Sequence, residues 1–128
     1  MWNKDLQMTK TIENVHQNGI NALLSFKDHS EVVTGGDDGK MVITTFLKST
    51  NKSIQSHSAA HITAIKEVGM DNFCCVSVDQ RLSFYSQELE LKHQIFSHCP
   101  DIADAVWIEN ENTFIVVGSN SLERFSIN

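Results

Sequence analysis

Two groups of histidine and cysteine residues in this chain carry side chains that could bind a metal ion. The first is the pair His57 and His61, and the second is formed by His93, His98 and Cys99. Zinc takes four nitrogen or sulfur ligands in a tetrahedral arrangement, and two residues four positions apart converge on one ion when they lie on a helix. The sequence predicts no helix at either place, so we expect no metal site.

Hydrolytic chemistry would need a nucleophile beside an acid and a base. His16, Asp38 and a serine have the residue types of a hydrolase triad, but no G-x-S-x-G turn presents that serine. The glycine-rich run at 34–39 is not followed by a Lys-Ser/Thr pair that opens a helix. A strand-to-strand turn is therefore favoured over a phosphate-binding loop. We predict that the chain is not an enzyme and holds no cofactor.

Asp101 and Asp104 form a carboxylate pair that could transfer protons. They follow Pro100, which fixes the backbone at the entry to the next strand, so a solvated loop is the simpler interpretation. The loop differs from the corresponding positions elsewhere in the chain, and binding residues are common on loops. We therefore expect a partner contact here.

The histidines and aspartates recur at a fixed interval. His16, His57 and His98 are 41 residues apart, and Asp38 and Asp79 have the same separation. Each copy contains short β-branched and apolar runs with turn residues every eight to twelve positions, which is typical of all-β proteins. No window has a sustained helical pattern of apolar residues, which argues against a helical repeat. A period of about 40 to 45 residues with four strands favours a β-propeller blade of the WD-repeat class.

We therefore predict an all-β fold of about three WD-repeat β-propeller blades that form an incomplete propeller. Residues 1–15 are an N-terminal segment, in which Gln7 to Val15 are expected to form the outer strand of a missing blade. Blades are expected at 16–56 and 57–97, and a partial blade without a fourth strand at 98–128. Closed propellers need at least about four blades, so the chain is expected to be part of a larger array.

In this class, a histidine before the first strand, a Ser or Thr on the second strand and an Asp in the second turn share hydrogen bonds with a Trp on the third strand. A buried network of this kind fixes the loops of a blade when every member is satisfied. We predict this structural role, rather than a catalytic one, for six residues. They are His16, Thr34 and Asp38 in the first copy and His57, Cys75 and Asp79 in the second. Thr44 and Tyr85 stand at the Trp positions.

Composition and charge limit the partners and the compartment. The 128 residues are 41% hydrophobic and carry a formal net charge of −6, so direct attraction to nucleic acid or anionic lipid is not expected. No stretch approaches the roughly 20 apolar residues of a membrane span, and the first residues lack the apolar core of a signal peptide. The three cysteines contain no CxxC pair. A cytoplasmic protein without membrane contact is expected.

Three segments carry a resemblance to a known family: Ser77 to Phe84, Pro100 to Asp104, and Gly118 to Glu123. Together they resemble the C-terminal end of the WD-repeat family that includes WD repeat-containing protein six and its fungal counterpart. The likeness extends upstream through His16 to Phe46 and so covers nearly the whole chain. Members of that family are several times longer, and the signature Trp-Asp dipeptide is absent from every copy here.

The resemblance implies a non-catalytic subunit that partners an FtsJ-like methyltransferase. That enzyme methylates the 2′-hydroxyl of the wobble nucleotide in the tRNA anticodon loop, and it would bind the S-adenosylmethionine, while the propeller protein helps to hold the tRNA. The negative charge agrees with a subunit role, because a chain that bound tRNA alone should be basic. The alternative is a WD-repeat scaffold in trafficking or signalling. The expected partner contacts are Lys40, Gln80 and Arg81 in the second turns, and Asp101 and Asp104 before the third blade.

Overall fold

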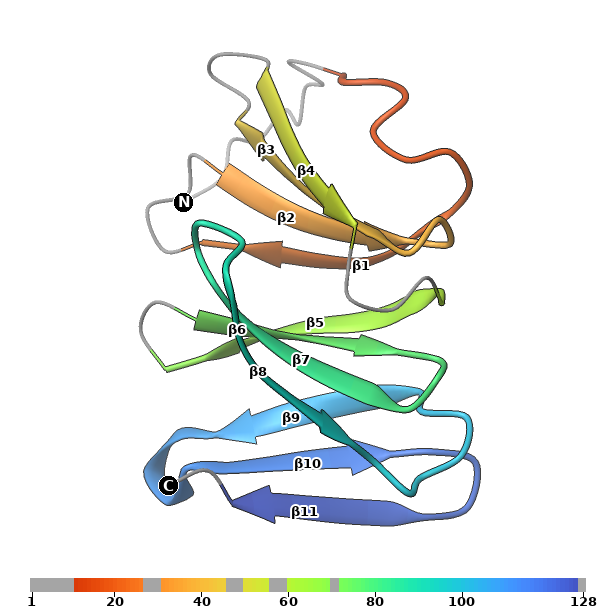
Figure 1. Cartoon of the computed structure of the whole chain (residues 1–128), viewed down its shortest axis with the longest axis vertical. Helices are drawn as coiled ribbons and strands as arrows, with labels where there is room; N and C mark the ends of the chain where they lie inside the picture. Colours follow the sequence, from red (N-terminus) through yellow and green to blue (C-terminus); the bar gives the residue numbers. More distant parts are fainter. Residues whose placement is uncertain (1–10, 27–30, 46–49, 56–59, 70–71, 127–128) are drawn as a thin grey trace, which may run out of the picture.

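The computed structural model describes residues 11–26, 31–45, 50–55, 60–69 and 72–126 (Figure 1). Within these ranges the strands form three antiparallel sheets, and the prediction of an all-β chain is confirmed. The first sheet contains β1 (Ile20–Ser25), β2 (Glu31–Gly36), β3 (Lys40–Thr45) and β4 (Thr50–Gln55). The second contains β5 (Ile62–Val68), β6 (Asn72–Ser77), β7 (Arg81–Ser86) and β8 (Leu91–Phe96). The third contains β9 (Asp104–Ile108), β10 (Thr113–Val117) and β11 (Leu122–Ser126), with a 3₁₀ turn at Glu109–Glu111.

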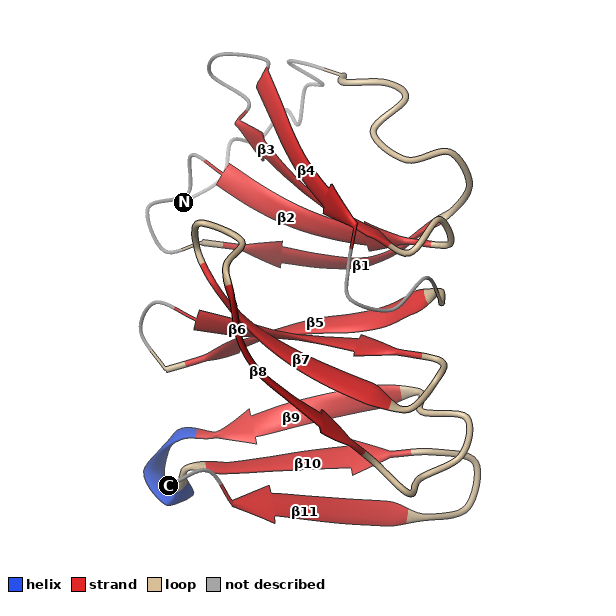
Figure 2. Ribbon diagram, in the orientation of Figure 1, coloured by secondary structure: helices blue, strands red, loops and turns tan. Residues whose placement is uncertain are grey.

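Each sheet is a meander in which consecutive strands pair, and each falls within one copy of the sequence repeat (Figure 2). The second strands explain why the sheets stack. Phe73 to Ser77 in β6 are all buried, as are Val33 to Gly36 in β2. A strand that is covered on both faces reads as a continuous apolar run, and its neighbours must supply both covers. β8, at the outer edge of its sheet, is only partly buried and carries Lys92.

Two apolar cores fill the spaces between the sheets. Val33 and Met41 of the first sheet pack with Phe73 and Tyr85 of the second. The second core joins the other side of the second sheet to the third and is built from the residues Ala64, Val68, Cys74, Val76, Leu82, Phe84, Cys99, Ile102, Ala105, Phe114 and Val116. Cys74 and Cys75 are neighbours in β6, yet Cys75 belongs to the first core and Cys74 to the second. Successive side chains of a strand point to opposite faces, so the two thiols lie on opposite sides of the sheet.

The register of the first strands shifts the repeat from 41 residues to 42 between the first two sheets. Ile20 pairs with Gly36 and Ile62 pairs with Ser77, so β5 starts one residue later relative to its second strand. Counted from these strands, the position that corresponds to His16 is residue 58 and not His57. His57 itself lies outside the described residues.

The turn between β10 and β11 is one residue shorter than its counterpart in the second sheet. Val76 pairs with Leu82 across six positions, whereas Val117 pairs with Leu122 across five. The step of 41 residues from Asp79 to Asn120 therefore reaches a turn of different geometry.

The strand expected over Gln7 to Val15 is not found in the part of it that the structure describes. Residues 11–15 form a loop, and residues 7–10 lie outside the described ranges. Asn14 has a φ of 59°, in the left-handed region, which interrupts an extended strand. In the described ranges, no helix is long and apolar enough to cross a membrane.

Candidate functional site

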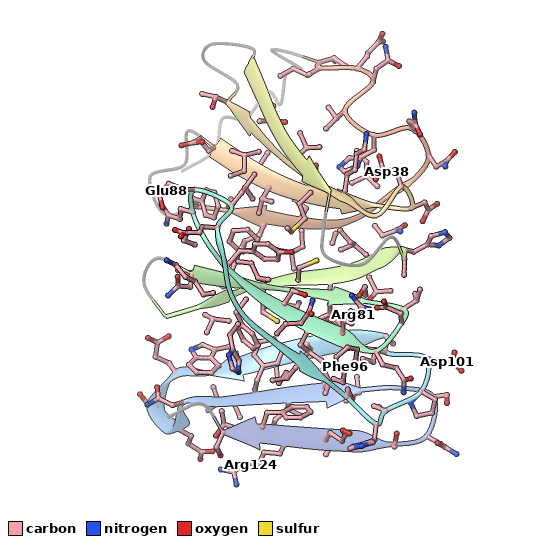
Figure 3. The ribbon with its side chains drawn as sticks, viewed as in Figure 1. Asp38, Arg81, Glu88, Phe96, Asp101 and Arg124 are labelled. Atoms are coloured by element: carbon pink, nitrogen blue, oxygen red, sulfur yellow. The ribbon has the colours of Figure 1, made fainter. Side chains whose placement is uncertain are left out.

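One edge of the stacked sheets gathers most of the sequence-predicted site residues. It consists of the turns after β2, β6 and β10 together with the segments before β1, β5 and β9, and we call it the turn edge. Figure 3 labels Asp38, Arg81 and Asp101 along this edge, and Glu88 at the opposite one. The arrangement follows from the meander, because every second turn and every entry to a first strand lies at the same end of its sheet.

In the first sheet, the structure brings together the three predicted residues of the first copy. His16 Nδ1 donates to the carboxylate of Asp38 at 3.0 Å from Oδ1, and His16 Nε2 lies 2.8 Å from Thr34 Oγ1. The side chain of His16 is fully buried and that of Asp38 is 5% exposed. These contacts tie the loop before β1 to β2 and to the β2–β3 turn.

Backbone groups complete the environment of Asp38. Its carboxylate accepts hydrogen bonds from the N–H groups of Lys40, at 3.0 Å, and Gln17, at 3.2 Å. Burial acts to raise the pKa of Asp38, but the hydrogen bond from His16 and the two from the backbone outweigh it. The pKa of Asp38 therefore lies below its ordinary value, and the carboxylate is ionised at neutral pH.

Thr44, at the position where this class of blade has Trp, is not part of this network. Thr44 is buried, and its hydroxyl has no hydrogen-bond partner. A Trp N–H at this position would reach across to the Thr on the second strand, whereas the short Thr44 side chain leaves its own oxygen unsatisfied. Thr34 instead donates to the carbonyl of Val42, at 3.5 Å.

In the second sheet, the turn aspartate is held by different partners. Asp79 accepts a hydrogen bond from Ser77 Oγ at 2.5 Å and forms an ion pair with Arg81 at 3.2 Å. Cys75, at the position of Thr34, is buried in the first core, and burial followed by the charge of Asp79 raises its pKa to about 12. Cys75 is thus a protonated, apolar core residue, and Tyr85 stacks on Phe73 in the same core.

In the third sheet, Cys99 occupies the place that His16 has in the first. A Cβ on Gly36 would lie 2.7 Å from His16 Nδ1, and a Cβ on Gly118 would lie 2.6 Å from Cys99 Sγ. Cys99 Sγ lies 3.0 Å from the hydroxyl of Ser121 and donates to its carbonyl at 3.3 Å. The loop before β9 is therefore fixed by a thiol and a hydroxyl.

His98 lies beside this contact with its side chain in solvent. The side chain is 99% exposed, and its Nδ1 is 3.7 Å from Glu123 Oε1. Glu123, on β11, accepts hydrogen bonds from the backbone N–H of His98 at 2.7 Å and from the hydroxyl of Ser97 at 3.2 Å. The sequence analysis missed Glu123, because a partly exposed glutamate on a short strand gives no pattern.

The predicted partner contacts Gln80 and Arg81 have partners within the chain. Gln80 Nε2 donates to the carbonyl of Cys99 at 3.0 Å, and Gln80 accepts at its own carbonyl from Ser97 N–H at 2.8 Å. The guanidinium of Arg81 lies 5.2 Å from the ring centroid of Phe96, a distance typical of a cation–π contact. The ring is exposed, so this pair presents an aromatic face with an adjacent positive charge to solvent.

Lys40 and the aspartates complete the candidate set. Lys40 lines a surface cavity of about 270 Å³ above the His16 network, together with Asn14 and Gln17. Asp101 is exposed and has a φ of 52°. Asp104 lies 3.3 Å from Lys66 Nζ and so bridges the second and third sheets.

A further bridge, which the sequence analysis missed, joins the first two sheets. Asn21 Nδ2 donates to Asp37 Oδ1 at 2.5 Å and to the carbonyl of Ile62 at 3.2 Å. Asp37 is also 3.6 Å from Nδ1 of His61. The residues lie in different copies, so no local motif could reveal the contact. Within the part of the chain that the structure describes, no cluster of three or more metal-ligating side chains occurs.

Comparisons with known proteins returned no match. No protein-family model matches this sequence, and no curated protein is significantly similar to it.

Proposed function

We propose that this chain is an array of WD-type propeller blades that serves as a non-catalytic subunit. Its partner on this proposal is an FtsJ-like methyltransferase that modifies the 2′-hydroxyl of the tRNA wobble nucleotide, and tRNA is bound as part of the complex. The partner supplies the S-adenosylmethionine site. This proposal rests on the resemblance carried by the turn around Asp79 and the loop from Pro100 to Asp104.

One observation carries the proposal: the two segments that bear the resemblance touch each other. They are about 20 residues apart in sequence, yet the side chain of Gln80 donates to the carbonyl of Cys99, and the N–H of Ser97 donates to the carbonyl of Gln80. Arg81 and Asp101 therefore belong to one continuous surface on the turn edge (Figure 3). A shared surface is what a protein partner requires.

Burial supports a structural role for the His16 network. The order Thr34, His16, Asp38 has the connectivity of a hydrolase triad. The imidazole has no exposed surface, and Thr34 is buried. A substrate carbonyl must approach within about 3 Å of the nucleophilic oxygen, and this packing leaves no such approach.

The charge of the chain supports a subunit role as well. A net charge of −6 opposes binding to phosphate, and each phosphate contact requires a basic group. The partner therefore provides most of the attraction for tRNA, while this chain provides shape and protein contacts.

The test is affinity purification of the tagged gene product from its own cells, with mass spectrometry, and mapping of wobble-nucleotide 2′-O-methylation after its depletion. Recovery of an FtsJ-like methyltransferase and loss of methylation are expected. Intact methylation with trafficking or signalling partners would support the scaffold alternative, and turnover by the isolated chain would contradict a non-catalytic role.

A pair of double variants locates the contact. Arg81→Glu combined with Asp101→Lys reverses two charges on the turn edge and is expected to abolish recovery of the methyltransferase. Lys92→Glu combined with Glu88→Lys makes the same two kinds of change at exposed positions off that edge and should leave recovery unchanged. Equal recovery with both double variants would contradict the turn edge as the binding surface.

A further inference from the structure

The two ends of the stack expose apolar side chains that its middle buries. Six large apolar residues are exposed in the described ranges: Ile20, Leu23, Val78, Phe96, Val106 and Leu122. Four of them lie on the outer faces of the first and third sheets. We call the face of a sheet that looks toward the next sheet along the chain its forward face, and the other its backward face.

Both internal interfaces join a forward face to a backward face. Val33 on the forward face of the first sheet packs with Phe73 and Cys75 on the backward face of the second. Cys74 and Val76 on the forward face of the second sheet pack with Phe114 and Val116 on the backward face of the third. The same interface is thus built twice.

The forward face of the third sheet is an unused copy of the first half of this interface. Ile115 and Val117 stand where Cys74 and Val76 stand, 41 residues earlier. Val106 pairs with Ile115 and is 51% exposed, and Leu122 pairs with Val117 and is 68% exposed. Leu82, which pairs with Val76 in the second sheet, is fully buried.

The backward face of the first sheet supplies the other half. Leu23 pairs with Thr34 on this face and is 65% exposed, and Ile20, at the same end of the sheet as Gly36, is 53% exposed. In the second sheet, Ile62 stands at the position of Ile20 and is fully buried against the first sheet. One chain therefore ends in two complementary faces, each of which lacks its other half among the described residues.

We propose that a second copy of this chain covers both faces, with the third sheet of each copy packed on the first sheet of the other. This contact is heterologous, and a head-to-tail contact closes into a ring when the rotation per subunit allows it. Two copies provide six sheets, which is within the four to eight blades of closed propellers. The assembly continues an interface already present twice in the chain, and it does not depend on the methyltransferase proposal.

The first strands show how the junction is made. β1 and β5 are linked by the hydrogen bond from Asn21 to Ile62, and β5 and β9 by the ion pair between Lys66 and Asp104. In the ring, β9 of one copy lies beside β1 of the other. Val106 stands at the position of Lys66, forty residues later, and faces Ala22, so this junction is apolar where the internal one is charged.

The test is the mass of the purified 128-residue chain, measured by sedimentation over a range of concentrations. Two variants each remove one half of the junction: Leu122→Lys on the forward face and Leu23→Lys on the backward face. We expect the native chain to form a complex of two copies and each variant alone to be a monomer. A mixture of the two variants should regain a two-chain complex at higher concentration, because one intact junction remains between them.

Val78→Lys is the matched control, since Val78 is an exposed apolar residue in a turn and not on either outer face. This variant should form the same complex as the native chain, and circular dichroism should show the same folded spectrum for all three variants. A native chain that stays monomeric at every concentration would overturn the proposal. Dimerisation of Leu23→Lys alone would also overturn it, because that result indicates a symmetric contact between two forward faces.

Discussion

The loops that enter the first and third sheets solve the same packing problem with different chemistry. In both, a side chain from the loop lies against a glycine at the end of the second strand, Gly36 in one case and Gly118 in the other. In the first sheet that side chain is His16, which is paired with a buried carboxylate. In the third it is Cys99, which contacts only a hydroxyl and a carbonyl.

The comparison separates the position of a residue from its chemistry. The fold requires a loop side chain over the glycine, and either an ionisable pair or a neutral thiol contact meets that need. The energies differ, because a buried charge that loses its partner is far more costly than a neutral contact that is removed. The two loops should therefore respond very differently to substitution.

The largest effect is expected for His16→Ala. This change leaves the buried carboxylate of Asp38 without its imidazole partner, and removal of one member of a buried pair costs about 3 to 5 kcal/mol. The free energy of unfolding from urea titration measures the loss. His98→Ala is the matched change in the third sheet and should alter stability by less than about 0.5 kcal/mol, because an exposed side chain is removed. Equal effects of the two changes would contradict the comparison.

Gly118→Ala is expected to have the second largest effect. The added methyl group would collide with the carbonyl oxygen of Pro100 and lie 2.6 Å from Cys99 Sγ. Because a backbone carbonyl cannot rotate away, the loop must move, and overpacking of this kind costs about 1 to 3 kcal/mol. Gly36→Ala tests the same contact in the first sheet, where the methyl group would meet Gly19 O at 2.8 Å. A wild-type melting temperature for either variant would show that the loop is not pressed on the glycine.

An acid titration distinguishes the two loops next. The pKa of Asp38 is lower in the folded chain than its ordinary value, so ionised Asp38 stabilises the fold at neutral pH. That contribution is complete above the ordinary pKa of aspartate and is lost as the pH falls through the lowered, folded value. Asp38→Asn should therefore be less stable than the native chain at pH 7 and should lose less stability on acidification. Parallel stability curves from pH 7 to pH 2 would contradict this expectation.

The smallest effect is expected for Cys99→Ala, at about 1 kcal/mol. The change removes a neutral contact with Ser121 and leaves a small void next to Gly118. Cys99→Ser keeps a group that can hydrogen-bond and should recover part of the loss. Chemical denaturation of both variants measures the difference, and a loss for Cys99→Ala as large as that for His16→Ala would contradict the neutral character of this contact.

The residue pattern predicts the all-β fold and the partners of His16, because these depend on local runs and on a repeat that can be counted. Thr34, with its hydroxyl on the second strand, and Asp38, in the turn, are matched by residue type alone. The same counting misplaces the second copy, since one residue in the turn between β5 and β6 changes the register and moves the equivalent of His16 from residue 57 to residue 58.

The third sheet escapes sequence-based prediction for a different reason. The histidine spacing selects His98, but the adjacent Cys99 makes the buried contact, and nothing in a cysteine next to a proline indicates a thiol packed over glycine. Glu123 and Asn21 are likewise known only from distances between strands that are far apart in sequence.

The opposed thiols of β6 allow the motions of the two cores to be timed separately. Burial, and then the neighbouring thiol, raises the pKa of Cys74 well above its ordinary value, and burial raises that of Cys75 to about 12, so neither reacts while the sheets are packed. Alkylation at Cys75 thus requires the first sheet to separate from the second, whereas alkylation at Cys74 requires the third to separate. Two adjacent atoms in one strand therefore act as independent clocks for transient opening on the two sides of the molecule.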